Sequence, residues 1–135
     1  MKLRIVWIGK TKDPAIASLC ADYAARIKHF LPLEIVETRE PKIDPAERLI
    51  ALDPKGKSWS SQGFAKFVQQ HMNSDSRRLT FLIGDYAGLP DSIQKRADVL
   101  WSLSPLTFTH DLTRVLLLEQ IYRALTIIKN LPYAR

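Results

Sequence analysis

Two glycine- and hydroxyl-bearing segments of the chain have the composition of a ligand-binding site. The first, GDYAGLP (84–90), follows a short apolar run, and its Gly84 and Gly88 allow backbone conformations and a close approach that other residues do not. The second, SLSPLTFTH (102–110), combines hydroxyl groups with apolar surface. This mixture suits a nucleoside-like molecule, because apolar walls hold the base while a few polar groups set its orientation. The side chains of the second segment that supply the mixture are Ser102, Ser104, Thr107, Thr109, Leu103, Leu106 and Phe108.

His110 lies where the second segment enters the last predicted helix. Three interpretations remain open from spacing alone. The side chain could cap the helix, make a buried hydrogen bond, or position and exchange a proton in a reaction.

Familiar catalytic signatures are absent from the sequence. It contains no GxxxxGK[ST] phosphate loop, no GxGxxG fingerprint and no GxSxG elbow. One cysteine, Cys20, and 3 scattered histidines provide no metal-ligand cluster, so no metal is expected. The sequence therefore does not predict standard nucleotide hydrolysis, serine hydrolysis or zinc chemistry. A single cysteine also precludes an intramolecular disulfide, which favours a cytoplasmic setting.

The elements that must position these segments alternate along the chain. A charged loop with two prolines is expected over residues 39–47. The alternation predicts one α/β domain over residues 1–135, with a mainly parallel sheet and helices on both faces. Strands are expected over residues 3–8, 33–38, 48–53, 79–83 and 99–104, and helices over 14–28 (capped by Asp13), after Ser60 or Ser61, after a cap at Asp91 or Ser92, and over 111–129.

Parallel strands place their carboxyl ends at the same edge of a sheet, where ligands bind. The loops LDPKGK (52–57), GDYAGLP and SPLTFTH each follow a predicted strand. We therefore expect the three loops to form one site.

The C-terminal segment DLTRVLLLEQIYRALTIIK (111–129) has apolar side chains in nearly all directions. A surface helix needs only one apolar stripe, so this helix must be buried on several sides. In so small a chain, the extra apolar face is expected to meet a second copy. Glu119 and Arg123 have the spacing of a helical ion pair, so Arg123 could be purely structural.

Charge and hydropathy narrow the class of protein further. The net charge of +6 favours a polyanionic partner, nucleic acid first, although it could serve solubility alone. The longest strongly apolar run, VLLL (115–118), is far too short to span a membrane, and Arg4 interrupts the only stretch that suggests a signal peptide. No membrane association is expected.

The segment SLSPLTFTHDLTRVLLLEQIYRA (102–124) closely resembles the C-terminal signature of the RlmH family, the SPOUT-class methyltransferases of bacterial large-subunit ribosomal RNA. The resemblance covers nearly the whole chain. Further matches occur in the same order at MKLRIVWIGKTKD, ALDPKGKSWSS, FLIGDYAGLP and NLPY.

This resemblance implies a SPOUT-type α/β fold with a C-terminal trefoil knot, and a homodimer built through the knot and the C-terminal helix. It implies methylation of a pseudouridine ring nitrogen of 23S rRNA on the ribosome, with S-adenosylmethionine bound in the knot loops. Carried over by position, the expected cofactor contacts are Leu52, Gly84, Asp85, Gly88, Leu103, Ser104, Pro105, Leu106, Thr107, Phe108 and Thr109.

The same signature places polar residues near the expected reaction centre, at His110, Arg114, Tyr122 and Arg123. His110 is expected to position the substrate or handle its proton, because the pseudouridine nitrogen must lose a proton. Arg114 and Arg123 are expected to contact substrate or phosphate.

The chain departs from the family pattern at three places. Asp85 replaces the second glycine of the loop, where its carboxylate could attract the cofactor's cationic groups or crowd the site. Ala134 stands where the family has a histidine, and the chain is shortened around residues 39–48, where a helix is expected. These departures keep two alternatives open: a methyltransferase for another RNA, or a degenerate protein that binds RNA or ribosomes without catalysis.

Overall fold

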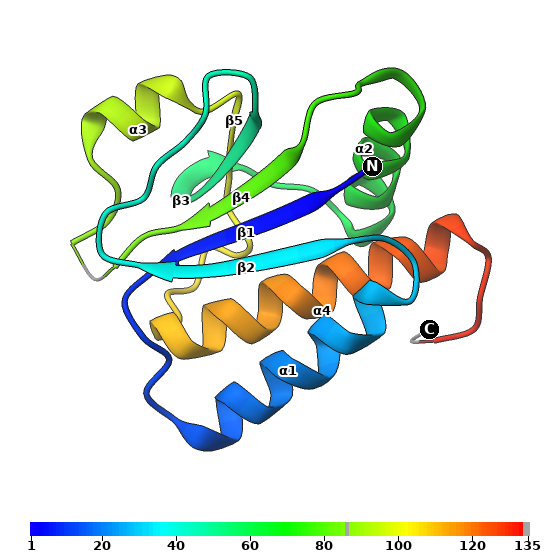
Figure 1. The fold of residues 1–135 in the computed structure, drawn as a ribbon, viewed down its shortest axis with the longest axis horizontal. Helices are drawn as coiled ribbons and strands as arrows, with labels where there is room; N and C mark the ends of the chain where they lie inside the picture. Colours follow the sequence, from blue (N-terminus) through cyan, green and yellow to red (C-terminus); the bar gives the residue numbers. More distant parts are fainter. Residues whose placement is uncertain (86, 134–135) are drawn as a thin grey trace.

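A five-stranded sheet flanked by helices makes up the computed structural model, which describes residues 1–85 and 87–133 (Figure 1). The elements follow the predicted alternation. In chain order they are β1 (Leu3–Ile8), α1 (Pro14–Lys28), β2 (Leu33–Thr38), β3 (Arg48–Lys57), α2 (Ser61–Ser74), β4 (Leu79–Ile83), α3 (Asp91–Arg96), β5 (Val99–Trp101) and α4 (His110–Ile128).

Most predicted boundaries are confirmed, and the N-terminal caps explain why. Asp13 accepts a hydrogen bond from the Ala15 amide at 2.8 Å, and Ser60 caps α2. The caps predicted at Asp91 or Ser92 are wrong, because Pro90 precedes α3 and no side chain caps that helix. The strand expected over residues 99–104 ends at Trp101, and β3 continues four residues beyond its predicted end.

Every strand pair in the sheet is parallel, in the order β2-β1-β4-β3-β5. β4 lies at the centre, and all five of its residues are buried. Such a strand reads as a continuous apolar run because both of its faces are covered. The prediction of an α/β fold with a mainly parallel sheet is confirmed.

Helices cover both faces of the sheet, as predicted, but unequally. Helices α1, α2 and α4 pack on the face that carries Ile5, Phe81 and Trp101. The opposite face carries Val6 and Leu82. Among the described residues, it is covered by the short α3 and by loop side chains such as those of Ile43 and Leu89.

Helix α4 packs against α1, α2 and the central strand β4, while α1 also contacts β2 (Figure 1). Most of its apolar side chains are therefore buried within one chain. Leu112 and Ile127 remain 44% and 39% exposed. The all-round apolar pattern thus has a largely intramolecular cause, and the expected dimer rests on fewer side chains than the sequence suggested.

β3 contains an irregularity in its pairing with β5, so two separate parts of β3 contact the end of β5. Trp101 pairs with both Leu52 and Lys57, and the Ser102 amide donates to the Lys57 carbonyl at 2.8 Å. A Cβ on Gly56 would lie 2.5 Å from the backbone of Leu100, so this approach requires glycine. The trefoil knot implied by the family resemblance stays a prediction.

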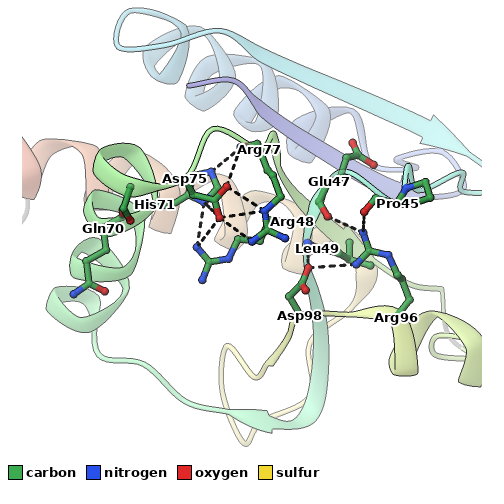
Figure 2. Close-up of polar contacts among 11 residues, drawn as sticks. Pro45, Glu47, Arg48, Leu49, Gln70, His71, Asp75, Arg77, Arg96 and Asp98 are labelled. Atoms are coloured by element: carbon green, nitrogen blue, oxygen red, sulfur yellow. Dashed lines mark hydrogen bonds and ion pairs between the residues drawn. The ribbon is translucent and has the colours of Figure 1, made fainter.

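The loop at residues 39–47 contains no helix, and arginines hold its end in place (Figure 2). Arg96 donates to the carbonyls of Asp44, Pro45 and Glu47 at 3.2, 3.3 and 2.6 Å. The buried Glu47 carboxylate is paired with Arg4 and Arg78 at 3.3 and 2.6 Å. The short connection is thus anchored by side chains instead of by a helix.

Candidate functional site

A cavity of about 240 Å³ lies at the carboxyl ends of β3, β4 and β5. The three loops expected to meet there do so. Nine of the predicted cofactor contacts line the cavity: Leu52, Gly84, Asp85, Gly88, Leu103, Ser104, Leu106, Thr107 and Phe108. Pro105 and Thr109, also predicted, do not line it.

The cavity has apolar walls, and Leu106, one of the residues that line it, is 72% exposed. Two of the predicted hydroxyls shape the loop that follows β5. Ser102 Oγ donates to the Ser104 carbonyl at 2.9 Å, and Ser104 Oγ accepts from the Leu106 amide at 3.0 Å. These serines therefore hold the loop in its conformation, and its backbone forms part of the wall.

The loop after β4 is a tight turn. The Gly88 amide donates to the Asp85 carbonyl at 2.8 Å, and the Asp85 carboxylate accepts from the Ala87 amide at 3.0 Å. Gly88 has a φ of +80°, a conformation that favours glycine. A Cβ on Gly84 would lie 2.9 Å from the Leu89 side chain, so the backbone stays thin where it borders the cavity.

His110 is the first residue of α4 and lines the cavity. The helix is capped by Thr109, whose hydroxyl accepts from the Leu112 amide at 3.3 Å. Within residues 1–85 and 87–133, the His110 side chain makes no hydrogen bond. The capping alternative for His110 is therefore wrong, and its ring is available to a ligand.

Arg114 is almost fully buried, with 2% exposure. Its guanidinium donates to Thr11 Oγ1 and to the Ile8 carbonyl, both at 2.9 Å, and lies over the Trp7 ring. Burial lowers the pKa of Arg114, while the nearby carboxylates of Asp111 and Glu37 oppose that shift. In this chain Arg114 ties the start of α4 to the end of β1, and it does not line the first cavity.

Arg123 lies thirteen residues beyond His110 in the same helix, about 20 Å along its axis. It forms the predicted ion pair with Glu119 at 2.8 Å and stacks on Tyr133. The structure does not bring it to the cavity of its own chain. Ala134 lies outside the described residues.

Ser102, singled out from sequence for its hydroxyl, also lines the cavity. Several other lining residues were not singled out from sequence: Asp53, Pro54, Ile83, Leu89, Trp101 and Thr113. All but Thr113 lie in or beside the loops that were recognised. Thr113 could have been found from helical spacing, because it follows His110 by three residues and so lies on the same face of α4.

Two features are absent from residues 1–85 and 87–133. No group of three or more His, Cys, Asp or Glu side chains there could hold a metal ion. Within the same part of the chain, no helix has the length and apolar character needed to cross a membrane.

Comparison with known sequences gives matches along the full length of the chain. The family model described as "Predicted SPOUT methyltransferase" matches residues 1–134. A protein of Solibacter usitatus named ribosomal RNA large subunit methyltransferase H is 42% identical over 140 residues, covering 100% of both chains. A protein of the same name from Trichlorobacter lovleyi is 40% identical over 151 residues, covering 98% of this chain and 99% of its own.

Solved structures of distant sequence share the fold. A probable methylase family protein from Haemophilus influenzae superimposes with a TM-score of 0.67 at 10% identity, covering 95% of this chain and 68% of that one. A probable methyltransferase from Bordetella pertussis gives a TM-score of 0.61 at 13% identity, covering 92% and 94%.

Proposed function

The chain belongs to the SPOUT methyltransferase family, and we propose that it methylates large-subunit ribosomal RNA with S-adenosylmethionine as methyl donor. The substrate proposed is the ring nitrogen N3 of a pseudouridine in 23S rRNA. The observation that carries the proposal is the full-length identity of about 40% to relatives that are named for this substrate class. A ribosomal substrate also implies a cytoplasmic location.

The residues of the cavity fit the proposed cofactor. Apolar side chains such as Leu52, Leu103 and Phe108 offer walls for an adenine ring. Gly84 lets the Leu89 side chain and the Gly88 backbone pack closely against it, because a Cβ there would lie 2.9 and 3.1 Å from them, and this packing holds the loop that borders the cavity. Asp85 adds a carboxylate at the wall, which suits the cationic sulfonium and amino groups of S-adenosylmethionine.

The chemistry requires orientation more than covalent assistance. S-adenosylmethionine supplies an electrophilic methyl group on sulfur, and the substrate nitrogen must approach it in line. Positioning contributes much of the rate in such a displacement, so the main role proposed for the cavity is to fix the orientation of the methyl donor. His110, at the cavity wall with a free ring, is proposed to orient the substrate base and take part in removing its proton.

A homodimer through α4 and the C-terminal knot is part of the proposal. Leu112 and Ile127 on α4 and Leu19 on α1 leave apolar surface exposed at 44%, 39% and 46%. Arg123 lies far from the cavity of its own chain. In the proposed dimer, the face of α4 that carries Arg123 could instead lie against the second copy.

Calorimetric titration with S-adenosylmethionine and S-adenosylhomocysteine tests the proposed function first. One ligand bound per subunit, followed by methyl transfer to large subunits that lack the modification, is the expected result. If both ligands fail to bind at millimolar concentration, the chain is a degenerate RNA- or ribosome-binding protein. If binding occurs and only another RNA is methylated, the proposed substrate is wrong.

A further inference from the structure

A second cavity, of about 650 Å³, adjoins the first. Asp85 and His110 line both cavities, so they form the boundary between them. The remaining walls come from the segment that joins β1 to α1, from the first turn of α4 and from Arg39 beyond β2. The residues that line only this second cavity are Ile8, Gly9, Lys10, Lys12, Asp13, Ile16, Arg39, Thr109, Asp111, Leu112 and Arg114.

Three cationic side chains at this cavity make no intramolecular polar contact with the described residues: those of Lys10, Lys12 and Arg39. Arg39 is exceptional in this respect. Every other arginine within residues 1–85 and 87–133 donates to a carboxylate, a carbonyl, a hydroxyl or a histidine ring. A guanidinium that is left without a partner beside a cavity is well placed for an anionic ligand.

A fourth cation lies beneath the cavity wall. Arg114 is buried, and its Nε has no hydrogen-bond partner among the described residues. The carboxylate of Asp111 lies 4.0 Å from Nη1 of Arg114. It already accepts hydrogen bonds from the amides of Lys12 and Asp13, at 3.1 and 2.8 Å. The carboxylates of Asp111 and Glu37 lie near Arg114, but among the described residues the Nε of this buried guanidinium has no acceptor, which favours an anion in the adjoining space.

Two helix N-termini also face this cavity. Asp13 and Thr109, the N-caps of α1 and α4, both line it. The first turns of these long helices lie on the same side of the molecule (Figure 1). Because each helix N-terminus carries a partial positive charge, the two termini partly offset the carboxylates of Asp13 and Asp111.

From this arrangement we propose that the second cavity binds a backbone phosphate of the RNA substrate, held by Lys10, Lys12 and Arg39 above the buried Arg114, while the adjacent target base reaches the boundary formed by His110 and Asp85. The inference rests on the proposed function and adds the subsite that presents the nucleotide. The methyl donor and the RNA then approach His110 from opposite sides.

The test is a charge-removing double variant, Lys10→Gln with Arg39→Gln. Its matched control is Lys66→Gln with Lys95→Gln, which removes the same charge from exposed positions on α2 and α3. We expect the first pair to raise KM for unmodified large subunits about tenfold, with kcat and S-adenosylmethionine affinity within twofold of wild type. The slope of log KM against log salt should fall by roughly 0.7, as for one phosphate that is no longer neutralised. Equal effects of the two pairs would overturn the proposal.

A second measurement separates failure of this subsite from failure of the proposed function. The wild-type protein and both double variants are titrated with inorganic phosphate and with uridine 5′-monophosphate, and the backbone amide signals of Gly9 and Lys10 are followed by NMR. Shifts that saturate in the wild type and control but not in Lys10→Gln with Arg39→Gln support the subsite even if ribosomes are not methylated. Absence of shifts in the wild type refutes it even if they are.

Discussion

His110 lies at the boundary of two cavities, and its ring makes no hydrogen bond with the residues that the structure describes. This position leads to a prediction about rate. His110→Gln should lower kcat for methyl transfer to unmodified large subunits about 100-fold, because proton handling and base orientation are lost. Affinity for S-adenosylmethionine should stay within threefold. The matched control is His29→Gln at an exposed position. A loss of cofactor affinity as large as the loss of kcat would instead give His110 a structural role.

A substitution at Asp85 distinguishes two explanations of this departure from the family pattern: its carboxylate either attracts the cofactor or crowds the site. Asp85→Asn keeps an oxygen that can accept from the Ala87 amide but removes the charge. If the carboxylate attracts the sulfonium, this variant should bind S-adenosylmethionine about tenfold more weakly and S-adenosylhomocysteine almost unchanged, since only the former carries that charge. Calorimetry with the two ligands measures the ratio. Tighter binding of both would show that Asp85 crowds the site.

The segments that form the first cavity could be found from sequence because glycine, proline and hydroxyl residues cluster after apolar runs. The roles of single residues could not. Ser102 and Ser104 look like ligand contacts in sequence, yet they bond to the backbone of their own loop. Arg114 looks like an exposed substrate contact, yet it bonds to Ile8 and Thr11, more than 100 positions earlier in the chain. Long-range contacts of this kind leave no local pattern.

At the scale of elements, the close approach of β3 and β5 decides whether the cavity can form. Gly56→Ala would place a methyl group 2.5 Å from the backbone of Leu100, where no flexible side chain can move aside. We expect this variant to lose several kcal/mol of unfolding free energy, in the range of severe overpacking, and to lose cofactor binding. Urea denaturation followed by circular dichroism measures the first effect and calorimetry the second.

The control for Gly56→Ala is Gly63→Ala in α2, where the nearest atom to the new methyl group is Ser60 Oγ at 3.2 Å. Alanine favours a helix interior over glycine by about 1 kcal/mol, but here the capping Ser60 hydroxyl must shift slightly, so this variant should lose far less stability than Gly56→Ala. Equal stability of the two variants would mean that β5 can move away from β3.

Element boundaries were predictable wherever a local signal marks them. Asp13 followed by Pro14 marked the start of α1, and a run of apolar residues marked the central strand. The extension of β3 to Lys57 could not be predicted, because the pairing that creates it involves Trp101, far along the chain. The lack of a side-chain cap on α3 could not be predicted either. Asp91 and Ser92 are both suitable cap residues, but in the structure they lie inside the first turn of the helix.

At the scale of the whole molecule, two buried groups make stability depend on pH. Burial lowers the pKa of His71 from 6.5, and its ring bonds to the Arg77 carbonyl and to Arg48 (Figure 2). For Glu47, burial raises the pKa. Hydrogen bonds from Thr80 and the Asp44 amide, together with the nearby arginines, lower it by more, so the pKa of Glu47 lies below 4.5. Both groups thus bind protons less readily when the chain is folded.

The unfolding free energy should therefore be greatest above pH 6.5, decline below it as unfolded His71 becomes protonated, and decline more steeply below pH 4.5 as unfolded Glu47 does. Urea denaturation at a series of pH values measures this. In His71→Gln the decline between pH 6.5 and 5 should shrink, while the exposed-site control His29→Gln should keep it. An unchanged decline in His71→Gln would assign that pH dependence to other groups.

The proposed dimer makes a prediction at the same scale. Sedimentation should give twice the subunit mass of 15.4 kDa. Ile127→Glu places a charge on exposed apolar surface of α4 and should shift the equilibrium to the monomer, whereas Lys129→Glu beside it should not. A monomeric wild type would remove the dimer from the proposal.

The Asp111 carboxylate accepts hydrogen bonds from the amides of Lys12 and Asp13, which lie 99 and 98 positions earlier in the chain. The site therefore depends on contact between the first strand's exit and the last helix. During synthesis, the N-terminal segment emerges first and must wait for the C-terminal helix before either cavity is complete. A nascent chain therefore lacks the assembled site until helix α4 has been synthesised and has left the ribosome.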